Sequence, residues 1–304
     1  MPPEEADTLG SPHTPPSAMT SRLFLPALAL ALALTGCDAA SDPIDSATGD
    51  DLADAAVAIG EAVSLNAGGL LDDAASLAAL ATPTAAKAAH PDRPGCEGNR
   101  TFDDAGTWTS TLACERGNPD GRFYASFART TTHRFLDADG SPQQNPAGAS
   151  SVEFAILNGE GTRRTPRHEH VLESLGASAL VTDLDTDLVT VNGTYDRDGV
   201  NTFTGRNGGT REVDFALSLT ATDVQGPRRG DDRRDRWAHA VAGTLSGLYT
   251  ATITTTSPDG TTRVREVERT FTVTFPDEGG QRQARIAMGG QQFDADPATG
   301  ALRD

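Results

Sequence analysis

Two histidines one residue apart, His168 and His170, form the most suggestive chemical cluster in the sequence. On an extended strand, residues i and i+2 point to the same side, and neutral imidazole is a frequent ligand of metal ions. A metal site needs a third ligand, and the candidates are His133 and Glu173, which the sequence does not place. The alternative is a solvated pair on a polar edge strand beside Pro166, and we expect that alternative.

Asp183, Asp185 and Asp187 occupy alternate positions and would share one face of a strand. Calcium prefers roughly six to eight oxygen ligands, and the EF-hand loop requires glycine at its sixth position. Leu188 stands at that position, which excludes the EF-hand loop. Loose binding of extracellular calcium remains open, but a charged hairpin or edge strand that discourages edge-to-edge pairing is the simpler interpretation.

Catalytic patterns are missing from the sequence. In the segment 243–247, Ser246 stands one position late for the G-x-S-x-G nucleophile elbow. Lys87 is the one lysine among 25 basic residues, which excludes a Walker-type phosphate loop and a Ser-x-x-Lys nucleophile. We therefore predict a protein that is not an enzyme and uses no cofactor. A hydrolase centred on His168 is the least favoured reading.

The charge balance argues against a nucleic-acid partner, because binding to phosphate backbones needs an excess of Lys and Arg. The chain has 25 basic and 43 acidic residues, a formal net charge of −18. Residues 227–236 alternate blocks of opposite charge. This segment is either a docking loop for a charged partner or a solvated hairpin tip, and we expect the tip.

The strongest pattern lies near the N-terminus. Arg22 precedes an apolar run, residues 23–34, which is shorter than the about 20 residues of a membrane-spanning helix. The run ends in Leu34-Thr35-Gly36-Cys37. This tetrapeptide resembles the lipobox of bacterial lipoproteins. Its small residues admit a peptidase, and its thiol accepts a lipid.

The resemblance implies that residues 1–36 are a signal peptide, that translation starts at Met19, and that Cys37 carries the lipid. An ordinary signal peptide, or a buried apolar helix with an incidental cysteine, is the alternative. The chain beyond Cys37 has no second apolar run of spanning length. We therefore expect a protein of the cell envelope, anchored to a membrane through lipid on the periplasmic side or the outer-membrane surface.

If Cys37 is lipidated, Cys96 and Cys114 are left as an even pair in an oxidising compartment. This favours a Cys96–Cys114 disulfide, which would stabilise the fold by about 3 kcal/mol in the chain-entropy model. Zinc is the rival reading, but two thiols without a nearby C-x-x-C or H-x-x-x-H pattern make a poor site.

The segments between residues 37 and 100 are short and poor in aromatic residues. Residues 37–50 are small and acidic and indicate a tether. Helical spacing then recurs on both sides of Gly68-Gly69, which predicts a helical hairpin over residues 51–81. Three prolines mark residues 82–100 as a linker.

Beyond this linker, apolar and polar residues alternate with period two, most clearly over 213–221 and 270–275. Such alternation is typical of antiparallel sheets with one buried face. Asp-Gly and Asn-Gly turn signals are widely spaced, so several strands should be long. We predict nine or ten strands over residues 101–304. The expected class is mainly β: a long-stranded, twisted antiparallel sheet or half-barrel with a short N-terminal helical hairpin.

This layout is similar to uncharacterised envelope lipoproteins of Bacteroidetes-type bacteria, through the turn Gly193–Gly199 and the stretch Gly68–Asp72. The resemblance offers no activity, and we expect a surface or scaffold role. The alternative is a carrier that binds a hydrophobic small molecule in the concave face of the sheet. The two differ in one feature: the helices either fill that face or leave a cavity of several hundred cubic ångströms.

Overall fold

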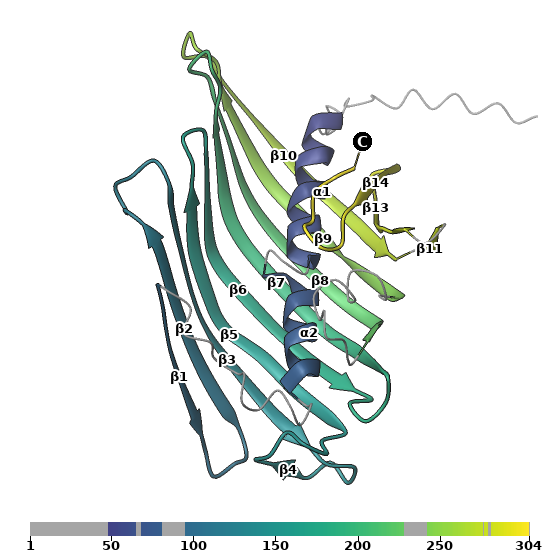
Figure 1. Ribbon diagram of the computed structural model, residues 1–304. Coiled ribbons are helices and arrows are strands. Elements are labelled where there is room, and N and C mark those ends of the chain that lie inside the picture. Colours follow the sequence, from purple (N-terminus) through teal and green to yellow (C-terminus); the bar gives the residue numbers. More distant parts are fainter. Residues whose placement is uncertain are drawn as a thin grey trace, which may run out of the picture. The chain divides into compact units, whose positions relative to one another are not determined.

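One large antiparallel sheet dominates the computed structural model, and its order across the sheet follows the order of the chain (Figure 1). Twelve strands take part, with β1 and β14 at the two edges and the short β4 paired only with β3. The structure describes residues 48–64, 68–80, 95–227, 242–275, 277–278 and 281–303. All of them belong to the unit of residues 44–304.

The strands of this sheet are longest in its middle, where β8 has 18 residues. A separate small hairpin joins β11 (Asp277–Glu278) to β12 (Gln281–Arg282). The strands of the large sheet are β1 (Cys96–Phe102), β2 (Trp108–Gly117), β3 (Tyr124–Leu136), β4 (Pro142–Gln143), β5 (Ser151–Arg164), β6 (His168–Thr182), β7 (Leu188–Thr204), β8 (Thr210–Pro227), β9 (Ala242–Thr256), β10 (Thr262–Thr274), β13 (Ala284–Met288) and β14 (Gln291–Ala295).

The predicted class is confirmed: the chain is mainly β, the sheet is antiparallel and open, and two short helices precede it. Two details differ from the prediction. The sheet begins at Cys96, inside the segment expected to be a linker up to residue 100. The strand count exceeds ten because β4, β13 and β14 have five residues or fewer, too few for the alternation to be recognised.

A further difference concerns the stretch Gly193–Gly199, which was expected to be a turn. It lies inside β7, and Tyr195 in its centre is buried. Gly199 is needed for a close approach and not for a reversal of the chain, because a Cβ there would lie 2.5 Å from the carbonyl oxygen of Val171 on β6. An Asp-Gly pair alone does not distinguish these two uses of glycine.

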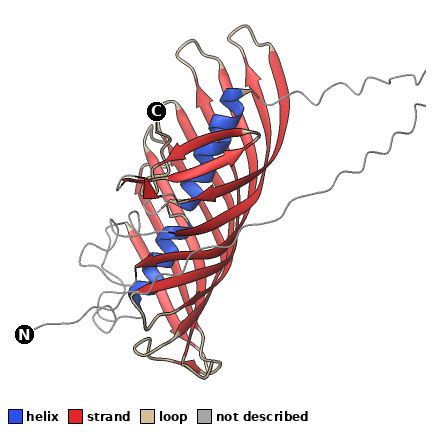
Figure 2. Ribbon diagram, turned by 90° about the vertical axis from the view of Figure 1, so that its right-hand side faces the viewer, coloured by secondary structure: helices blue, strands red, loops and turns tan. Residues whose placement is uncertain are grey.

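Both helices lie on one face of the sheet, which we call the inner face, and leave the opposite, outer face uncovered by helices (Figures 1 and 2). Helix α1 is Gly49–Val63 and helix α2 is Leu70–Leu80. Thr48 and Asp51 form a capping box at the start of α1. In both views the helices follow one another along the sheet, whereas a hairpin would pack them side by side. Each helix thus turns its buried residues to the sheet.

The core fills the space between the helices and the inner face. Aromatic side chains of the strands form its largest members, and Tyr195 also donates a hydrogen bond to the carbonyl of Gly68 at the break between the helices, 3.2 Å away. No helix in the described segments is long and apolar enough to cross a membrane. The bulky core residues that are almost fully buried are Tyr195, Tyr249, Phe135, Ile59, Leu71, Leu184, Leu217, Leu219, Leu245, Ile253 and Ile286.

Candidate functional site

Charged side chains divide between the two faces of the sheet. Strand register shows that, among the paired residues of β1 to β10, every charged residue on the inner face is an arginine, whereas every aspartate and glutamate faces outward. The inner-face arginines are Arg100, Arg116, Arg129, Arg163, Arg197, Arg211, Arg263, Arg265 and Arg269.

The helices supply the carboxylates that balance the central arginines. Asp51 is fully buried and accepts hydrogen bonds from Arg211 at 2.9 Å and from Arg265 at 3.0 Å. Burial by itself would raise the pKa of Asp51, but hydrogen bonds from Thr48 and the two arginines lower it below its usual value. The first helix is therefore held to β8 and β10 by a buried, charge-assisted network.

Helix α2 repeats this contact with Asp73, which lies 2.6 Å from Arg129 of β3. Burial raises the pKa of Asp73 to about 6, although Arg129 opposes that rise. At the end of α1, Glu61 lies 3.9 Å from Arg197. Pairs between a helix carboxylate and a strand arginine thus occur in both helices.

The inner face has almost no free volume where α2 covers it. The cavity there measures about 10 Å³ and is lined by Leu70, Asp73 and Leu77 of the helix and by strand residues that include Phe154 and Tyr195. A drug-sized ligand needs roughly 300 Å³ or more. Helix α2 therefore fills this part of the inner face, where the carrier hypothesis would place a hydrophobic ligand.

His168 and His170 share one face of their strand, as their spacing predicted. That face is the inner one, and the pair is half-buried on a central strand, so the expected solvated edge is wrong. Both contact the side-chain oxygen of Asn201, at 3.2 Å from Nε2 of His168 and 2.9 Å from Nδ1 of His170. Arg197 lies 2.9 Å from Nε2 of His170. Because arginine can only donate, Nε2 of His170 accepts and Nδ1 carries the proton.

This arrangement uses both ring nitrogens of His170 for hydrogen bonds within the protein. Burial lowers the pKa of His170, and the positive charge of Arg197 lowers it further. The described residues contain no group of three or more His, Cys, Asp or Glu side chains that could hold a metal ion. The cluster thus serves as a polar contact of the inner face.

His133, the suggested third ligand, lies elsewhere on the inner face. It accepts a hydrogen bond at Nε2 from Arg100, 2.6 Å away, and the guanidinium of Arg100 lies 4.2 Å from the centre of the Trp108 ring. Burial, followed by the charge of Arg100, lowers the pKa of His133 to about 4. Sequence reasoning missed this Arg–His–Trp cluster, because its members come from three strands whose register no local pattern reveals.

The three aspartates form an exposed turn and not a strand face. Asp183 has a φ of 62°, and its carbonyl accepts a hydrogen bond from the backbone of Thr186. The chain therefore reverses between β6 and β7 at Asp183, Asp185 and Asp187, which is the hairpin reading. Only the buried Leu184 of this turn reaches the core.

Cys96 and Cys114 form the predicted disulfide and lie directly opposite one another on β1 and β2. Ser246 lies on the outer face in the middle of β9, so no nucleophile elbow exists there. Cys37 with its lipobox and the charged run 228–236 lie outside the described residues.

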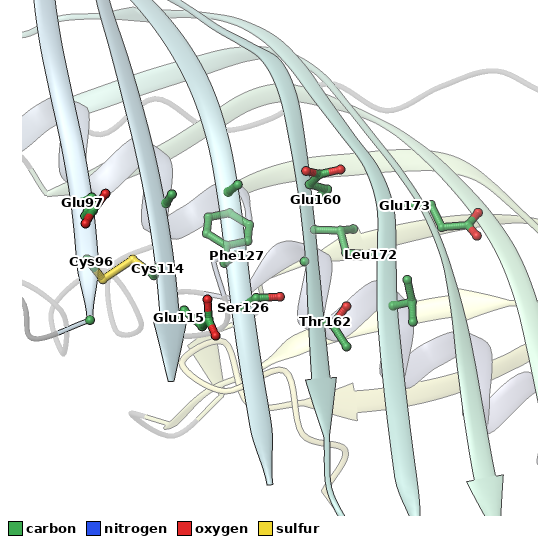
Figure 3. Close-up of a pocket in the computed structure, with 15 residues that line it drawn as sticks. Cys96, Glu97, Cys114, Glu115, Ser126, Phe127, Glu160, Thr162, Leu172 and Glu173 are labelled. Atoms are coloured by element: carbon green, nitrogen blue, oxygen red, sulfur yellow. A yellow bond between two sulfur atoms is a disulfide. The ribbon is translucent and has the colours of Figure 1, made fainter. Parts of the chain in front are cut away.

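The outer face is hollowed at several places, and two of these hollows adjoin one another. The first hollow measures about 810 Å³ and lies over β1 to β6 (Figure 3). Strand register aligns Glu97, Ala113, Ala128 and Glu160 across it. Small side chains in the middle of this row leave the space, and Figure 3 shows Glu97, Glu160 and Glu173 around it, with the disulfide at its β1 edge.

The second hollow measures about 870 Å³ and adjoins the first at Glu173, which lines both. Its central row is Asp198, Ala216, Thr250 and Glu268 on β7 to β10. We call the two hollows together the outer trough. The trough has small residues along its floor and carboxylates at both ends and in the middle, a feature that composition alone could not locate.

Comparison with known proteins places the chain in no family: no family model matches it, and no curated protein or solved structure does so either.

Proposed function

We propose that this protein is a lipid-anchored component of the cell envelope that acts without catalysis, as a surface or scaffold module attached through Cys37. The observation that favours this role over a hydrophobic carrier is the packing of the chain's own helices on the inner face. The cavity between α2 and the sheet is about 10 Å³, which is too small for a cargo molecule.

The anchor is supported by the lipobox Leu34-Thr35-Gly36-Cys37 and by the acidic tether 37–50 that follows it. Helix α1 begins at Gly49, so the folded unit starts where the tether ends. This order of anchor, tether and folded unit is what display of a domain at a membrane surface requires. A carrier of hydrophobic molecules, the alternative, would have to displace α1 or α2 and break their buried ion pairs with the sheet.

The anchor is tested by expressing the full chain in a bacterium that is fed radiolabelled palmitate. We expect label in the protein, recovery of the protein with the membrane fraction, and loss of both in the Cys37→Ala variant. A matched control, Cys96→Ser with Cys114→Ser, should keep the label because neither cysteine ends a lipobox. Equal labelling of the Cys37→Ala variant would overturn the proposed anchor.

A further inference from the structure

The outer face carries many more carboxylates than arginines. Among the paired residues of β1 to β10, only Arg134 and Arg164 are basic and face outward. Each of these arginines already pairs with a glutamate on the neighbouring strand, Glu153 or Glu169. The carboxylates that line the outer trough make no ion pair among the described residues; they include Glu97, Glu160, Glu173, Asp198, Asp214 and Glu268.

The inner face shows which partner chemistry such carboxylates meet in this protein. There, Asp51, Asp73 and Glu61 of the helices each contact arginines that project from strands. The guanidinium group matches a carboxylate with two parallel hydrogen bonds. The outer trough presents carboxylates of the same kind, and the described part of the chain provides no basic side chain that pairs with them.

The shape of the trough suits an extended ligand. Its central row crosses nine strands from β1 to β10, which makes eight intervals between neighbouring strands. At about 4.8 Å for each interval, the row spans roughly 40 Å, the length of about 12 residues of extended peptide. Ala113, Ala128 and Ala216 along this row leave room for a peptide backbone.

The number and spacing of the carboxylates favour a polycation over a single ion. Exposed ion pairs are individually weak, so useful affinity needs several of them at once. Among the described residues, no three or more acidic, His or Cys side chains are grouped closely enough to hold a metal ion. A long cationic chain can contact Glu97, Glu160 and Glu268 together, whereas a small amine cannot.

We propose that the outer trough binds an extended arginine- or lysine-rich polypeptide segment. Its basic side chains pair with the carboxylates from Glu97 on β1 to Glu268 on β10, and its backbone lies over the small residues between them. This inference goes beyond the proposed function and depends neither on the lipid anchor nor on the filled inner face.

The experiment uses the full-length chain in a nonionic detergent and a fluorescein-labelled peptide of about 12 residues in which arginine alternates with serine. Binding is followed by fluorescence anisotropy at low and high salt. We expect the triple variant Glu160→Gln, Glu173→Gln, Asp198→Asn to bind about tenfold more weakly than the wild type. Added salt should weaken wild-type binding, because it screens exposed charges.

The matched control removes three exposed carboxylates from turns outside the trough, with Asp104→Asn, Asp120→Asn and Asp139→Asn. This triple changes the net charge equally and should leave affinity within about twofold of the wild type. An equal loss in both triples would show that only net charge matters and would overturn the proposal. Absence of binding, salt-insensitive binding, or equally tight binding of spermine would also overturn it. The Cys37→Ala chain should bind like the wild type, so failure of the anchor and failure of the trough are distinguishable.

Discussion

At the scale of single residues, Asp51 makes the densest set of polar contacts in the helices. It caps α1 through Thr48 and accepts from Arg211 and Arg265 while fully buried. The variant Asp51→Asn would leave Arg265 facing a neutral group and would leave Arg211 with Asp54 as its remaining carboxylate partner. Breaking a buried ion pair typically costs several kcal/mol. We predict a loss of about 3 kcal/mol in the free energy of unfolding, measured with urea. The neighbouring exposed Asp50→Asn is the control and should change stability by less than about 0.5 kcal/mol; equal effects would refute the role of Asp51.

Asp73 gives the fold a specific pH dependence. Its folded-state pKa is raised from 3.8 to about 6, so the folded protein binds this proton more tightly than the unfolded chain. The contribution of this carboxyl to stability is therefore largest below pH 3.8 and declines as pH rises to about 6. The isosteric Asp73→Asn variant lacks this term. We predict that the stability of the variant relative to the wild type rises between pH 4 and pH 7 in urea titrations, and a constant difference would contradict the account.

The histidine pair and the buried aspartates show what sequence can and cannot reveal about a site. The i, i+2 spacing of His168 and His170 correctly predicted that they share a face. It could not reveal Asn201 and Arg197 as their partners, because cross-strand register depends on the whole sheet. The sequence shows arginines at alternating positions of the strands. It does not show that Asp51 and Asp73 neutralise their charge, because that depends on where the helices pack on the sheet.

At the scale of elements, helix α1 packs closely against the C-terminal loop at Gly60. A Cβ on Gly60 would lie 2.4 Å from the carbonyl oxygen of Gly300, a backbone atom that cannot give way cheaply. Alanine favours a helix over glycine by about 1 kcal/mol, yet we predict that Gly60→Ala destabilises the protein. The control is Gly49→Ala, which has open space around it and should not lower the melting temperature. Thermal unfolding of both variants tests this contact, and a stabilised Gly60→Ala protein would refute it.

The β1–β2 hairpin is the element that depends on the disulfide. β1 is an edge strand with mostly half-exposed or exposed side chains, and Cys96–Cys114 ties it to β2. In the double variant Cys96→Ser, Cys114→Ser, we predict faster amide hydrogen exchange in β1 and β2 and unchanged exchange in β7 to β9. Loss of protection throughout the sheet would mean that the disulfide stabilises the whole fold and not its edge.

Long strands were predictable because buried and exposed positions alternate along β8 from Glu212 to Ala221, and the sequence alternates in the same way. The helix positions were predictable for a similar reason, since Leu52, Ile59 and Val63 recur with helical spacing in the first helix, and Leu70 and Leu77 do so in the second. Their end-to-end placement was not, because two amphipathic helices satisfy the same pattern whether they pack on one another or on a sheet. The strands β13 and β14 have only five residues each, too few for a period of two to be recognised in the sequence.

At the scale of the whole described unit, the sheet separates charge: arginines face the helices, and carboxylates face away from them. On the inner side, Arg129, Arg197, Arg211 and Arg265 lie against carboxylates of the helices. A net charge of −18 is consistent with a protein whose free face is acidic. This division is the reason why we propose the outer face, and not the inner one, as the surface that binds a partner.

The central claim is that the inner face is filled by the chain's own helices and carries no cargo. The most direct test is a native mass spectrum of the full-length protein purified from membranes in a gentle detergent. We expect the mass of the chain and its anchor, less two hydrogens for the Cys96–Cys114 bridge, and nothing more. Additional bound mass that extracts into organic solvent and persists in the Cys37→Ala variant would contradict the claim and favour a hydrophobic carrier.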